Sequence, residues 1–589
     1  QVQIAVERAD YYEEAEDEEI EQAAERIFDK IQIVNSEYMK WFEVLLSFVF
    51  AIIGYMAPIW MLMFQAKMRQ IEMEDEVMQF QTIILMLMRI ERVNVEMILE
   101  WLERYANIFK EPISRCVNNY EAGAWEALEE MKEEIYNNVS YGDAEKESCL
   151  VDKDIDEISE AEDLVAIIGF EGCFPGAREV EGFWDNLING KNTIGRIDQQ
   201  RPEILSEFKK VYGEEPDDFP QYAGFVDDYN TFDAAFFGIS PREAESMDPQ
   251  QRKALELTWS LIESSGYAPS SLRGKKCGVF VGAHSNDYSE LTYFNQNFLK
   301  ESSAYIDSGL HMSMIANRVS RWFDFHGPSE TINTACSSSL VALYHAVQAL
   351  QNEECDMAVV EGINMIFSPI PFYGTYKAGM LASDGKCKTF DENADGYVRS
   401  EGYAGIFIKR LADAQRDGDT IWAVIKRAVI NHDGSSSSLR APNLNSQKNL
   451  IIDAYERENV SNVGYIEAHG TGTKLGDPIE ITALNEAFLQ LNPHISKKSC
   501  GIGTVKSNIG HSEACAGIAG VIKVILAINE HMLPGNLNYN RLNPYVPLDA
   551  GPFYIVDKNI KWNNKMDKEK LIPLMAGVSS FGFGGTNAH

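Results

Sequence analysis

The chain has 589 residues, of which 45% are hydrophobic and 24% charged, and its formal net charge at pH 7 is −37. This composition excludes an intrinsically disordered chain, and the length predicts two to four domains. The negative charge argues against nucleic-acid binding, because no basic field is available to replace the counterions on phosphate.

The nine cysteines include no CxxC pair or other metal-ligand spacing. We therefore expect free thiols in a reducing cytosol, no bound metal and a cytoplasmic location for the main domain. The chain begins at Gln1 and stops at His589 inside an expected strand. We expect it to be part of a longer polypeptide.

The first part of the chain is predicted to be helical, with an acidic segment over residues 1–40 and a helical region over residues 41–140. Within this region, residues 44–64 carry no formal charge. As a helix they would span about 31 Å, against a hydrocarbon core of about 30 Å. Gly54 and Pro58 interrupt the stretch, which membrane helices tolerate. We expect a transmembrane helix here, with a buried soluble helix as the alternative.

Two basic residues, Lys67 and Arg69, follow this stretch and would place that end in the cytoplasm. The succession GYMAPIW, EVMQFQTIILML and LEWLERYANIFKEPISRCVNNY makes residues 26–138 similar to type II secretion F-type membrane proteins of tight-adherence pilus assembly. We expect no catalytic residue there. The expected role is a membrane contact through residues 44–64, which would tether the protein to the inner membrane.

Residues 141–163 hold ten acidic residues and two lysines, and this composition predicts a linker. At Leu164 the composition changes abruptly, because DLVAIIGFEGCFPGA has the pattern of a strand that enters a Gly/Pro loop. Strand and helix patterns then alternate to the end of the chain. This alternation predicts an α/β domain over residues 164–589.

Cys336 lies in the run TACSSS, where the strand-like TINTA passes into an apolar helical pattern. The serines 337–339 suit the start of that helix. A thiol at a helix N-terminus is a candidate nucleophile, because unpaired backbone N–H groups and the helix dipole favour the thiolate. We therefore expect the pKa of Cys336 to lie below the usual value of about 8.5. A buried core cysteine is the alternative.

Two histidines follow in similar settings, His469 in EAHGTGT and His511 in KSNIGH. Imidazoles that donate hydrogen bonds near a reactive thiol suggest chemistry on a carbonyl or carboxylate beside a thioester. Thr471 and Thr473 offer hydroxyls toward an amide-containing arm. Lys506 would hold the imidazole network in register by its charge. Structural histidines and a solvated lysine are the alternatives.

The last motif, GVSSFGFGGTNAH, supplies a glycine loop that contains Gly584 and Gly585. Glycines let the backbone approach a reaction centre closely, and a simple tight turn is the alternative. The full set of blocks also includes DPQQR, TFDENADGYVRSEG and PGNLNYNRLNP. In this order they resemble the ketosynthase domain of type I modular polyketide synthases, a branch of the thiolase-fold condensing enzymes. HGTGTKLGDPIEI and AGVSSFGFGGTNAH are most similar to synthases supplied by a separate acyltransferase.

The resemblance implies a layered αβαβα fold for residues 164–589, preceded by an all-α, partly membrane-like region. It implies two pseudo-equivalent halves, a nucleophile half over about 164–420 and a histidine half over about 421–589. The family is usually homodimeric, and its other partners are an acyl carrier protein and a separate or neighbouring acyltransferase. No cofactor is bound directly, because the phosphopantetheine arm belongs to the carrier.

In this resemblance Cys336 accepts the acyl chain as a thioester, and the pantetheine arm of a malonyl carrier contacts Thr471 and Thr473. His469 and His511 would promote decarboxylation and stabilise the enolate, with Lys506 ordering His511. The carbanion then attacks the thioester and yields a β-ketoacyl chain on the carrier.

The implied oxyanion hole is the backbone N–H of Cys336 and of Phe583, next to Gly584 and Gly585. A site without metal would suffice, because neutral imidazole N–H groups stabilise an enolate oxygen without protonating the carbon.

Several alternatives remain at this stage. A non-elongating ketosynthase tends to lack the histidine of HGTGT, so the presence of His469 favours elongation. A degradative thiolase would need a second cysteine near the C-terminal glycine loop, and GFGGTNAH has none. A type I fatty acid synthase uses the same residues, and a membrane-anchored scaffold with an idle domain is a further possibility. The serines of HDGSSSSLRAPN depart from the family pattern and leave the acyl-chain preference open.

Overall fold

The structure is a computed structural model that describes residues 25–26, 28–30, 164–214, 219, 221–294, 305–567 and 570–589. The predicted transmembrane helix 44–64, the linker 141–163 and nearly all of the helical segments 1–40 and 41–140 lie outside the described residues, so these expectations stay predictions. Among the residues that are described, we find no helix with the length and apolarity needed to cross a bilayer.

The first sheet has six strands in the order β5-β4-β6-β7-β1-β8. The strands β4 and β6 consist entirely of buried residues, as expected for strands covered on both faces. β4 runs parallel to β5 and β6, and β7 runs antiparallel to β6 and β1. The strand bounds are β1 Val165–Cys173, β4 Cys277–Ala283, β5 Ser329–Ile332, β6 Met357–Asn364, β7 Gly402–Arg410 and β8 Ala423–Ile425.

The second sheet has four parallel strands in the order β13-β11-β10-β17. Beside it, a three-stranded antiparallel ribbon in the order β18-β19-β9 carries the C-terminal glycine loop. The bounds are β9 Ile430–His432, β10 Val463–Glu467, β11 Cys500–Gly503, β13 Phe553–Ile555, β17 Met575–Val578, β18 Ser580–Phe581 and β19 Thr586–Ala588.

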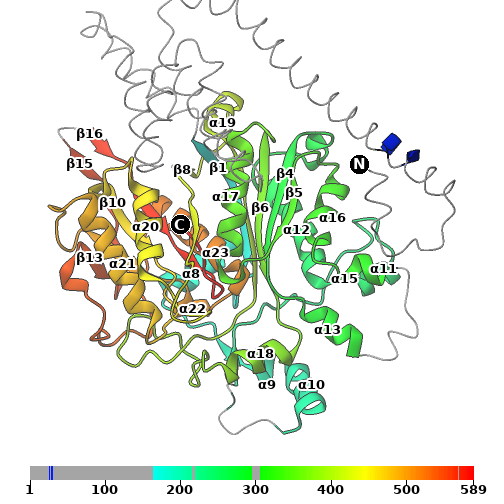
Figure 1. The fold of residues 1–589 in the computed structure, drawn as a ribbon, viewed down its shortest axis with the longest axis horizontal. Coiled ribbons are helices and arrows are strands. Elements are labelled where there is room, and N and C mark those ends of the chain that lie inside the picture. Colours follow the sequence, from blue (N-terminus) through cyan, green and yellow to red (C-terminus); the bar gives the residue numbers. More distant parts are fainter. Residues whose placement is uncertain are drawn as a thin grey trace, which may run out of the picture. The chain divides into compact units, whose positions relative to one another are not determined.

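Helices form three layers around these sheets (Figure 1). The middle layer consists of α17 (Ser338–Gln351) and α23 (Ala516–Asn529), whose side chains share one core with β1, β6 and β7. Such helices are apolar nearly all round because both faces are covered. One outer layer, on the first sheet, consists of α12 (Pro249–Ser264) and α16 (Met314–Phe323). The other, on the second sheet, consists of α20 (Leu444–Tyr455) and α21 (Gly476–Leu491). The predicted αβαβα arrangement is therefore confirmed.

The two middle helices begin in the same way. In one, β5 leads to the short helix η2 (Ala335–Ser337) and then to α17, and in the other η4 (Glu513–Cys515) leads to α23. Ala335 and Glu513 both adopt a positive φ, 59° and 45°, which a non-glycine residue takes only where the surrounding structure imposes it. The same strained elbow therefore precedes each middle helix.

The serines of the first elbow act within the turn. Ser338 Oγ accepts a hydrogen bond from Thr334 N–H at 2.9 Å and donates to the Ala335 carbonyl at 2.6 Å. Ser337, at the N-cap position of α17, makes no capping hydrogen bond with its side chain. The expectation that serines start the helix is met by their position, while their hydroxyls stabilise the elbow.

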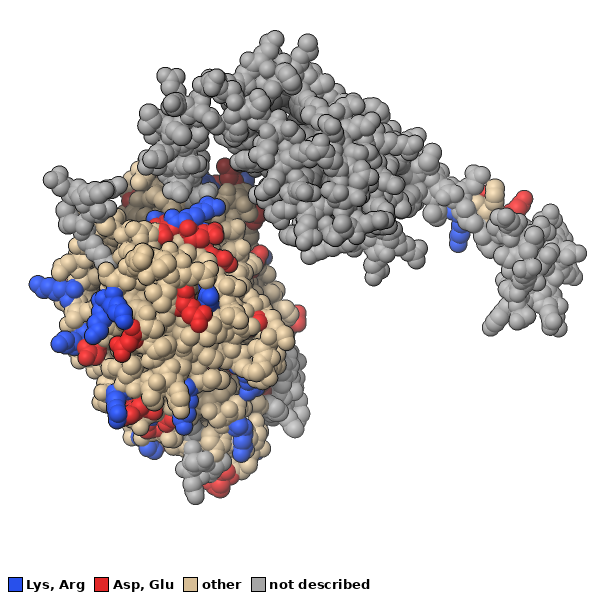
Figure 2. All heavy atoms as spheres, turned by 60° about the vertical axis from the view of Figure 1, so that its left-hand side comes forward, with Lys and Arg blue, Asp and Glu red and all other residues tan. Residues whose placement is uncertain are grey.

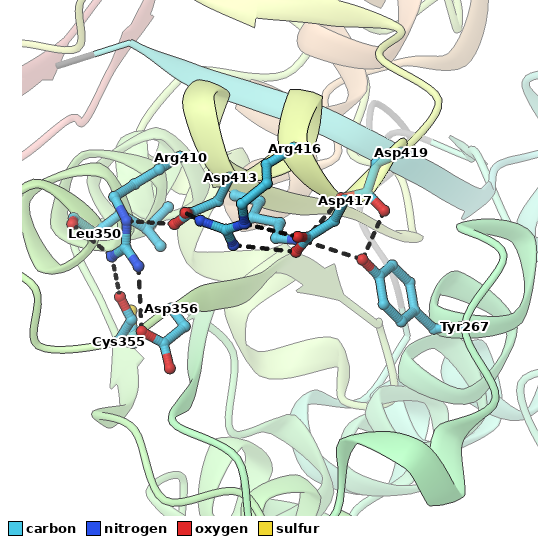
Figure 3. Close-up of polar contacts among 10 residues, drawn as sticks. Tyr267, Leu350, Cys355, Asp356, Arg410, Asp413, Arg416, Asp417 and Asp419 are labelled. Carbon is cyan, nitrogen blue, oxygen red and sulfur yellow. Dashed lines mark hydrogen bonds and ion pairs between the residues drawn. The ribbon is translucent and has the colours of Figure 1, made fainter. Parts of the chain in front are cut away.

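A polar network secures the far end of α17 (Figure 3). Arg410, at the end of β7, donates to the carbonyls of Leu350 and Cys355 at 3.1 and 2.8 Å and pairs with Asp413 at 2.6 Å. Asp413 belongs to α19 (Leu411–Asp417). These contacts hold the C-terminal end of α17 against the first sheet, so that both ends of the helix behind Cys336 are fixed.

The remaining elements are short and lie around this frame. Helices are α8 Val180–Ile188, α9 Ile197–Gln200, α10 Pro202–Tyr212, α11 Pro241–Ser246, α13 Asp287–Phe294, α15 Ile306–Leu310, α18 Pro369–Lys377, α22 Lys506–Ile509, η1 Pro269–Leu272, η3 Val460–Asn462 and η5 Leu548–Ala550. Strands are β2 Gly195–Arg196, β3 Tyr222–Ala223, β12 Met532–Leu533, β14 Ile560–Lys561, β15 Lys565–Asp567 and β16 Lys570–Ile572.

Candidate active site

The candidate nucleophile, Cys336, lies in the elbow between β5 and α17 and is only 9% exposed. Two backbone N–H groups, its own and that of Phe583, interact with its sulfur. Ser580 Oγ donates a hydrogen bond of 2.6 Å to the Cys336 carbonyl and so ties β18 to the elbow. The elbow and the glycine loop, distant in sequence, therefore each supply an N–H group that favours the thiolate form of Cys336.

The prediction that the pKa of Cys336 lies below its usual value is wrong. Burial raises the pKa of the Cys336 thiol to about 12, and the negative charge of Glu513 adds to this effect. The positive charge of Lys506 and the two N–H groups act in the opposite direction but do not outweigh burial. Removing a thiolate from water costs more free energy than the N–H groups at a helix N-terminus provide by stabilising it. The candidate nucleophile is therefore a neutral thiol at neutral pH.

The two predicted histidines meet in space. His469 follows β10, His511 precedes η4, and their ring centroids lie 5.5 Å apart at an interplanar angle of 82°. Burial, and then the positive charge of Lys506, hold the pKa of both imidazoles well below the usual value. Both rings are therefore neutral at neutral pH, the form in which one nitrogen donates a hydrogen bond.

The hydrogen bonds of His511 determine its tautomer. Its Nδ1 accepts the backbone N–H of Glu513 at 3.1 Å, so the neutral ring carries its proton on Nε2. This Nε2 is buried and has no hydrogen-bond partner among the described residues, and the same is true of His469 Nδ1. Buried polar atoms normally have partners. The two unpaired ring nitrogens are therefore expected to meet a ligand.

The backbone at His469 is fixed by a buried carboxylate. Glu480 accepts the N–H groups of His469 and Gly470 at 2.7 and 2.9 Å. Lys506, at the start of α22, is 3% exposed, and burial lowers its pKa while the carboxylates of Glu467 and Glu480 oppose that effect. The structure thus brings Lys506 to the two histidines and to Cys336, on which it acts through its charge.

Sequence reasoning missed a buried ion pair beside the thiol. Arg399 donates from Nε and Nη2 to the Glu513 carboxylate at 2.7 and 3.0 Å. Burial pushes the pKa of Glu513 upward, but the guanidinium of Arg399 outweighs it and holds that pKa below the usual value. Tyr397 packs its ring 5.0 Å from that of His511. The available signals were a Glu two residues after His511 and an Arg within DGYVRSEG, neither of which points to the other.

A cavity leads to Cys336 from the side of α18. It is lined by Cys336, by Pro371 and Thr375 of α18, and by Met380, with Arg440 and Phe583 also among its walls. His469 and His511 are not part of this lining. The thiol therefore lines this cavity, while the two imidazoles do not.

The two predicted threonines lie side by side and partly exposed, with their hydroxyl oxygens 3.3 Å apart. Thr473 Oγ1 accepts the N–H of Gly476 at 3.1 Å, and Asp477 accepts the N–H of Gly472 at 3.1 Å. These bonds hold the loop that presents the hydroxyls. The role of Thr471 and Thr473 in binding a pantetheine arm stays a prediction, as do those of Gly584 and Gly585.

Comparison with known families gives two adjacent matches. Residues 162–414 match "Beta-ketoacyl synthase, N-terminal domain", and residues 422–540 match "Beta-ketoacyl synthase, C-terminal domain". Among curated relatives, polyketide synthase PksN of Bacillus subtilis is 43% identical over 433 residues, which cover 72% of this chain and 8% of that protein. Polyketide synthase ThaG of Burkholderia thailandensis is 41% identical over 439 residues, which cover 72% of this chain and 8% of that protein. The chain thus spans only a small part of the length of these relatives.

Solved structures show the same likeness. The ketosynthase from module 6 of the bacillaene synthase from Bacillus subtilis 168 is 40% identical, with a TM-score of 0.65, and the match covers 72% of this chain and 71% of that one. The oxazolomycin ketosynthase domain OzmH KS7 of Streptomyces albus JA3453 is 36% identical, with a TM-score of 0.67, and the match covers 72% of this chain and 73% of that one.

Proposed function

Because residues 162–540 of this chain belong to the beta-ketoacyl synthase family, we propose that the domain condenses a Cys336-bound acyl chain with a malonyl unit carried by an acyl carrier protein, in polyketide biosynthesis. The single observation that carries the proposal is the pair of neutral imidazoles, His469 and His511, 5.5 Å apart, with the charge of one buried lysine, Lys506, acting on both rings and on the Cys336 thiol.

The first half of the reaction is acyl transfer. The sulfur of Cys336 attacks the thioester carbonyl of the acyl carrier, a tetrahedral oxyanion forms, and the carrier thiol leaves with the proton that Cys336 gives up. The N–H groups of Cys336 and Phe583 are the donors for that oxyanion, and losing one such donor typically costs about 10²- to 10³-fold in rate. The acyl chain then extends into the cavity that α18 lines.

The second half breaks one carbon–carbon bond and forms another. When the malonyl unit loses CO₂, the electron pair of the broken bond passes to an enolate whose oxygen accepts hydrogen bonds from His469 and His511. Neutral donors suit this step, because they stabilise the oxygen without protonating the carbon, and a water-excluded site strengthens them. The enolate carbon then attacks the Cys336 thioester, and the Cys336 thiolate is the leaving group.

The geometry favours an elongating enzyme over one that only passes acyl chains onward. An acyl-transferring ketosynthase needs the thiol and its oxyanion donors but no second imidazole. Here the His469 backbone is held by Glu480, and the ring faces His511. This arrangement serves enolate stabilisation. Loading without extension in the wild-type protein would favour the non-elongating alternative.

The proposed partners are an acyl carrier protein, a separate or neighbouring acyltransferase, and a second copy of this chain. Among the described residues β5 pairs only with β4, so its other edge is open to β5 of a second copy. On the face shown in Figure 2, basic and acidic side chains are interspersed, so an acidic carrier would meet no continuous repulsive field there. Membrane contact through residues 44–64 stays a prediction from sequence.

Intact-protein mass spectrometry tests the proposal. The protein is incubated with acyl-carrier substrates and then with malonyl carrier, and the mass of the loaded protein and of the carrier product is read. We expect an acyl adduct on Cys336 and a carrier product longer by two carbons with release of CO₂. Absence of any adduct at Cys336 would overturn the proposal.

A further inference from the structure

The glycine loop that carries Phe583 is held by a histidine that the proposed chemistry does not use. His432, at the end of β9, accepts the N–H of Gly434 on its Nδ1 at 2.9 Å. The neutral ring therefore carries its proton on Nε2, which lies 3.1 Å from the carbonyl oxygen of Gly584 and donates to it. One imidazole thus joins two loops that are far apart in the sequence.

The loop packs directly on this ring. Gly585 has a φ of 93°, and a Cβ at this position would lie 3.1 Å from His432 Nε2 and 3.2 Å from Asp433 Cβ. The N–H of Asp433 donates to the Gly585 carbonyl at 2.8 Å, and His432 is opposite Thr586 in the β9–β19 pairing. The path of the loop from Gly584 to Thr586 therefore depends on where the imidazole lies.

The direction of the Phe583 N–H is determined by backbone contacts more than by its side chain. Phe583 is 42% exposed, and its ring lies 6.0 Å from the His284 ring and 5.9 Å from the Arg440 guanidinium. The backbone from Gly582 to Gly585 forms a tight turn, in which the Gly585 N–H donates to the Gly582 carbonyl at 2.8 Å. The His432 contact at Gly584, one residue after Phe583, therefore anchors the turn from outside.

We propose that His432 is a positioning residue, which holds the backbone N–H of Phe583 toward the sulfur of Cys336 through its hydrogen bond to the Gly584 carbonyl. The inference rests on the proposed function, because this N–H matters only where an oxyanion forms at Cys336. His432 itself touches no reacting atom. Its removal slows acyl transfer without changing the access of a small reagent to the thiol.

Two substitutions at His432 isolate this contact. In His432→Gln the terminal amide nitrogen reaches the position of Nε2 and can donate to Gly584. In His432→Asn the side chain still accepts the Gly434 N–H but is too short to reach Gly584. We expect the rate of acyl transfer from an acyl carrier to Cys336 to fall about 10- to 100-fold in the Asn variant. This loss is smaller than the loss on complete removal of one oxyanion donor, because the Phe583 N–H is displaced but still present. In the Gln variant we expect an acyl-transfer rate within about threefold of the wild-type rate. His326→Asn, on an exposed side chain, is the matched control and transfers at the wild-type rate.

A second readout separates positioning from a folding defect. Iodoacetamide alkylates Cys336 by displacement of iodide, and no oxyanion forms at a carbonyl. We therefore expect its rate to fall far less than acyl transfer in His432→Asn, by no more than the small rise in the Cys336 pKa that follows when the Phe583 N–H moves away. In His432→Gln we expect the wild-type alkylation rate. Wild-type acyl transfer in His432→Asn overturns the inference, as does an equal loss of transfer and alkylation in both His432 variants. If the wild-type protein is alkylated but accepts no acyl chain, the proposed function fails, and this inference fails with it.

Discussion

Arg399 and Glu513 form a buried bidentate ion pair, with two N–O distances of 2.7 and 3.0 Å, and the Glu513 carboxylate raises the pKa of the neighbouring Cys336. The backbone N–H of the same Glu513 fixes the tautomer of His511. One residue of the second elbow thus acts on both the nucleophile and the proposed enolate donor. This residue therefore couples the elbow before α23 to the elbow before α17 at the candidate site.

Glu513→Gln is expected to lower the pKa of Cys336, because it removes a negative charge close to the sulfur while it keeps the backbone N–H. The measurement is the rate of iodoacetamide alkylation against pH, and its midpoint moves to lower pH. The same change leaves Arg399 unpaired and buried, which costs about 3–5 kcal/mol of stability. An unchanged alkylation midpoint in a folded variant would contradict the assigned influence of the carboxylate.

Cys336→Ala is expected to abolish acyl loading, since no other nucleophile replaces the sulfur. His469→Ala is expected to retain loading within a few-fold and to lower extension by about 10²-fold or more, because the enolate loses a donor. Mass spectrometry of the loaded protein and of the carrier product separates the two steps. Acyl transfer at the wild-type rate in Cys336→Ala would reject the assignment of the nucleophile.

Thr471→Val is expected to raise the KM for malonyl carrier by about 3- to 10-fold with little change in kcat, the loss expected for one hydrogen bond to a bound arm. Thr482→Val is the control, since Thr482 Oγ1 donates to the Pro478 carbonyl within α21. Steady-state kinetics with varied malonyl carrier makes the comparison. A change in kcat alone would place Thr471 elsewhere in the reaction.

Glu361, at the centre of β6, provides a pH-dependent test of stability. It is fully buried, its Oε1 accepts only the Thr258 hydroxyl at 2.6 Å, and its Oε2 has no partner among the described residues. Burial raises the pKa of Glu361 to about 8. The folded state therefore keeps the proton over a range in which the unfolded chain, with a pKa of about 4.3, has lost it.

Because the folded pKa is the higher one, the contribution of Glu361 to the stability of the domain falls as pH rises from about 4 to about 8 and is level above that range. Glu361→Gln removes the destabilisation that the buried carboxyl causes at high pH. We expect this variant to be more stable than the wild type by on the order of 4 kcal/mol at pH 9, with little difference at pH 4. Urea unfolding at both pH values measures it, with Glu330→Gln on an exposed side chain as control. Equal stability of the wild type and Glu361→Gln at pH 9 would show that the carboxyl is not held neutral.

The sequence predicted the layered fold and the three side chains at the centre of the candidate site. Strand, loop and helix patterns around Cys336, His469 and His511 are local, so they could be recognised without coordinates. The Arg399–Glu513 pair could not be found in this way, because the two residues meet only when the first sheet packs on α23. The His432 contact to the glycine loop was missed for the same reason.

What the sequence determined by itself was which residues are the candidates for the chemistry and in what order they occur, because each lies in a short motif with its own turn and helix signals. Only the tertiary structure decided their ionisation and direction. The pKa of Cys336 rises instead of falling because burial and the charge of Glu513 come from distant parts of the chain. The proton of His511 lies on Nε2 because the N–H of Glu513, only two residues further along the chain, donates to Nδ1, and Glu513 can do so only in the positive-φ backbone conformation that the packed elbow imposes. Desolvation and hydrogen bonding depend on packed surroundings, which no local motif contains.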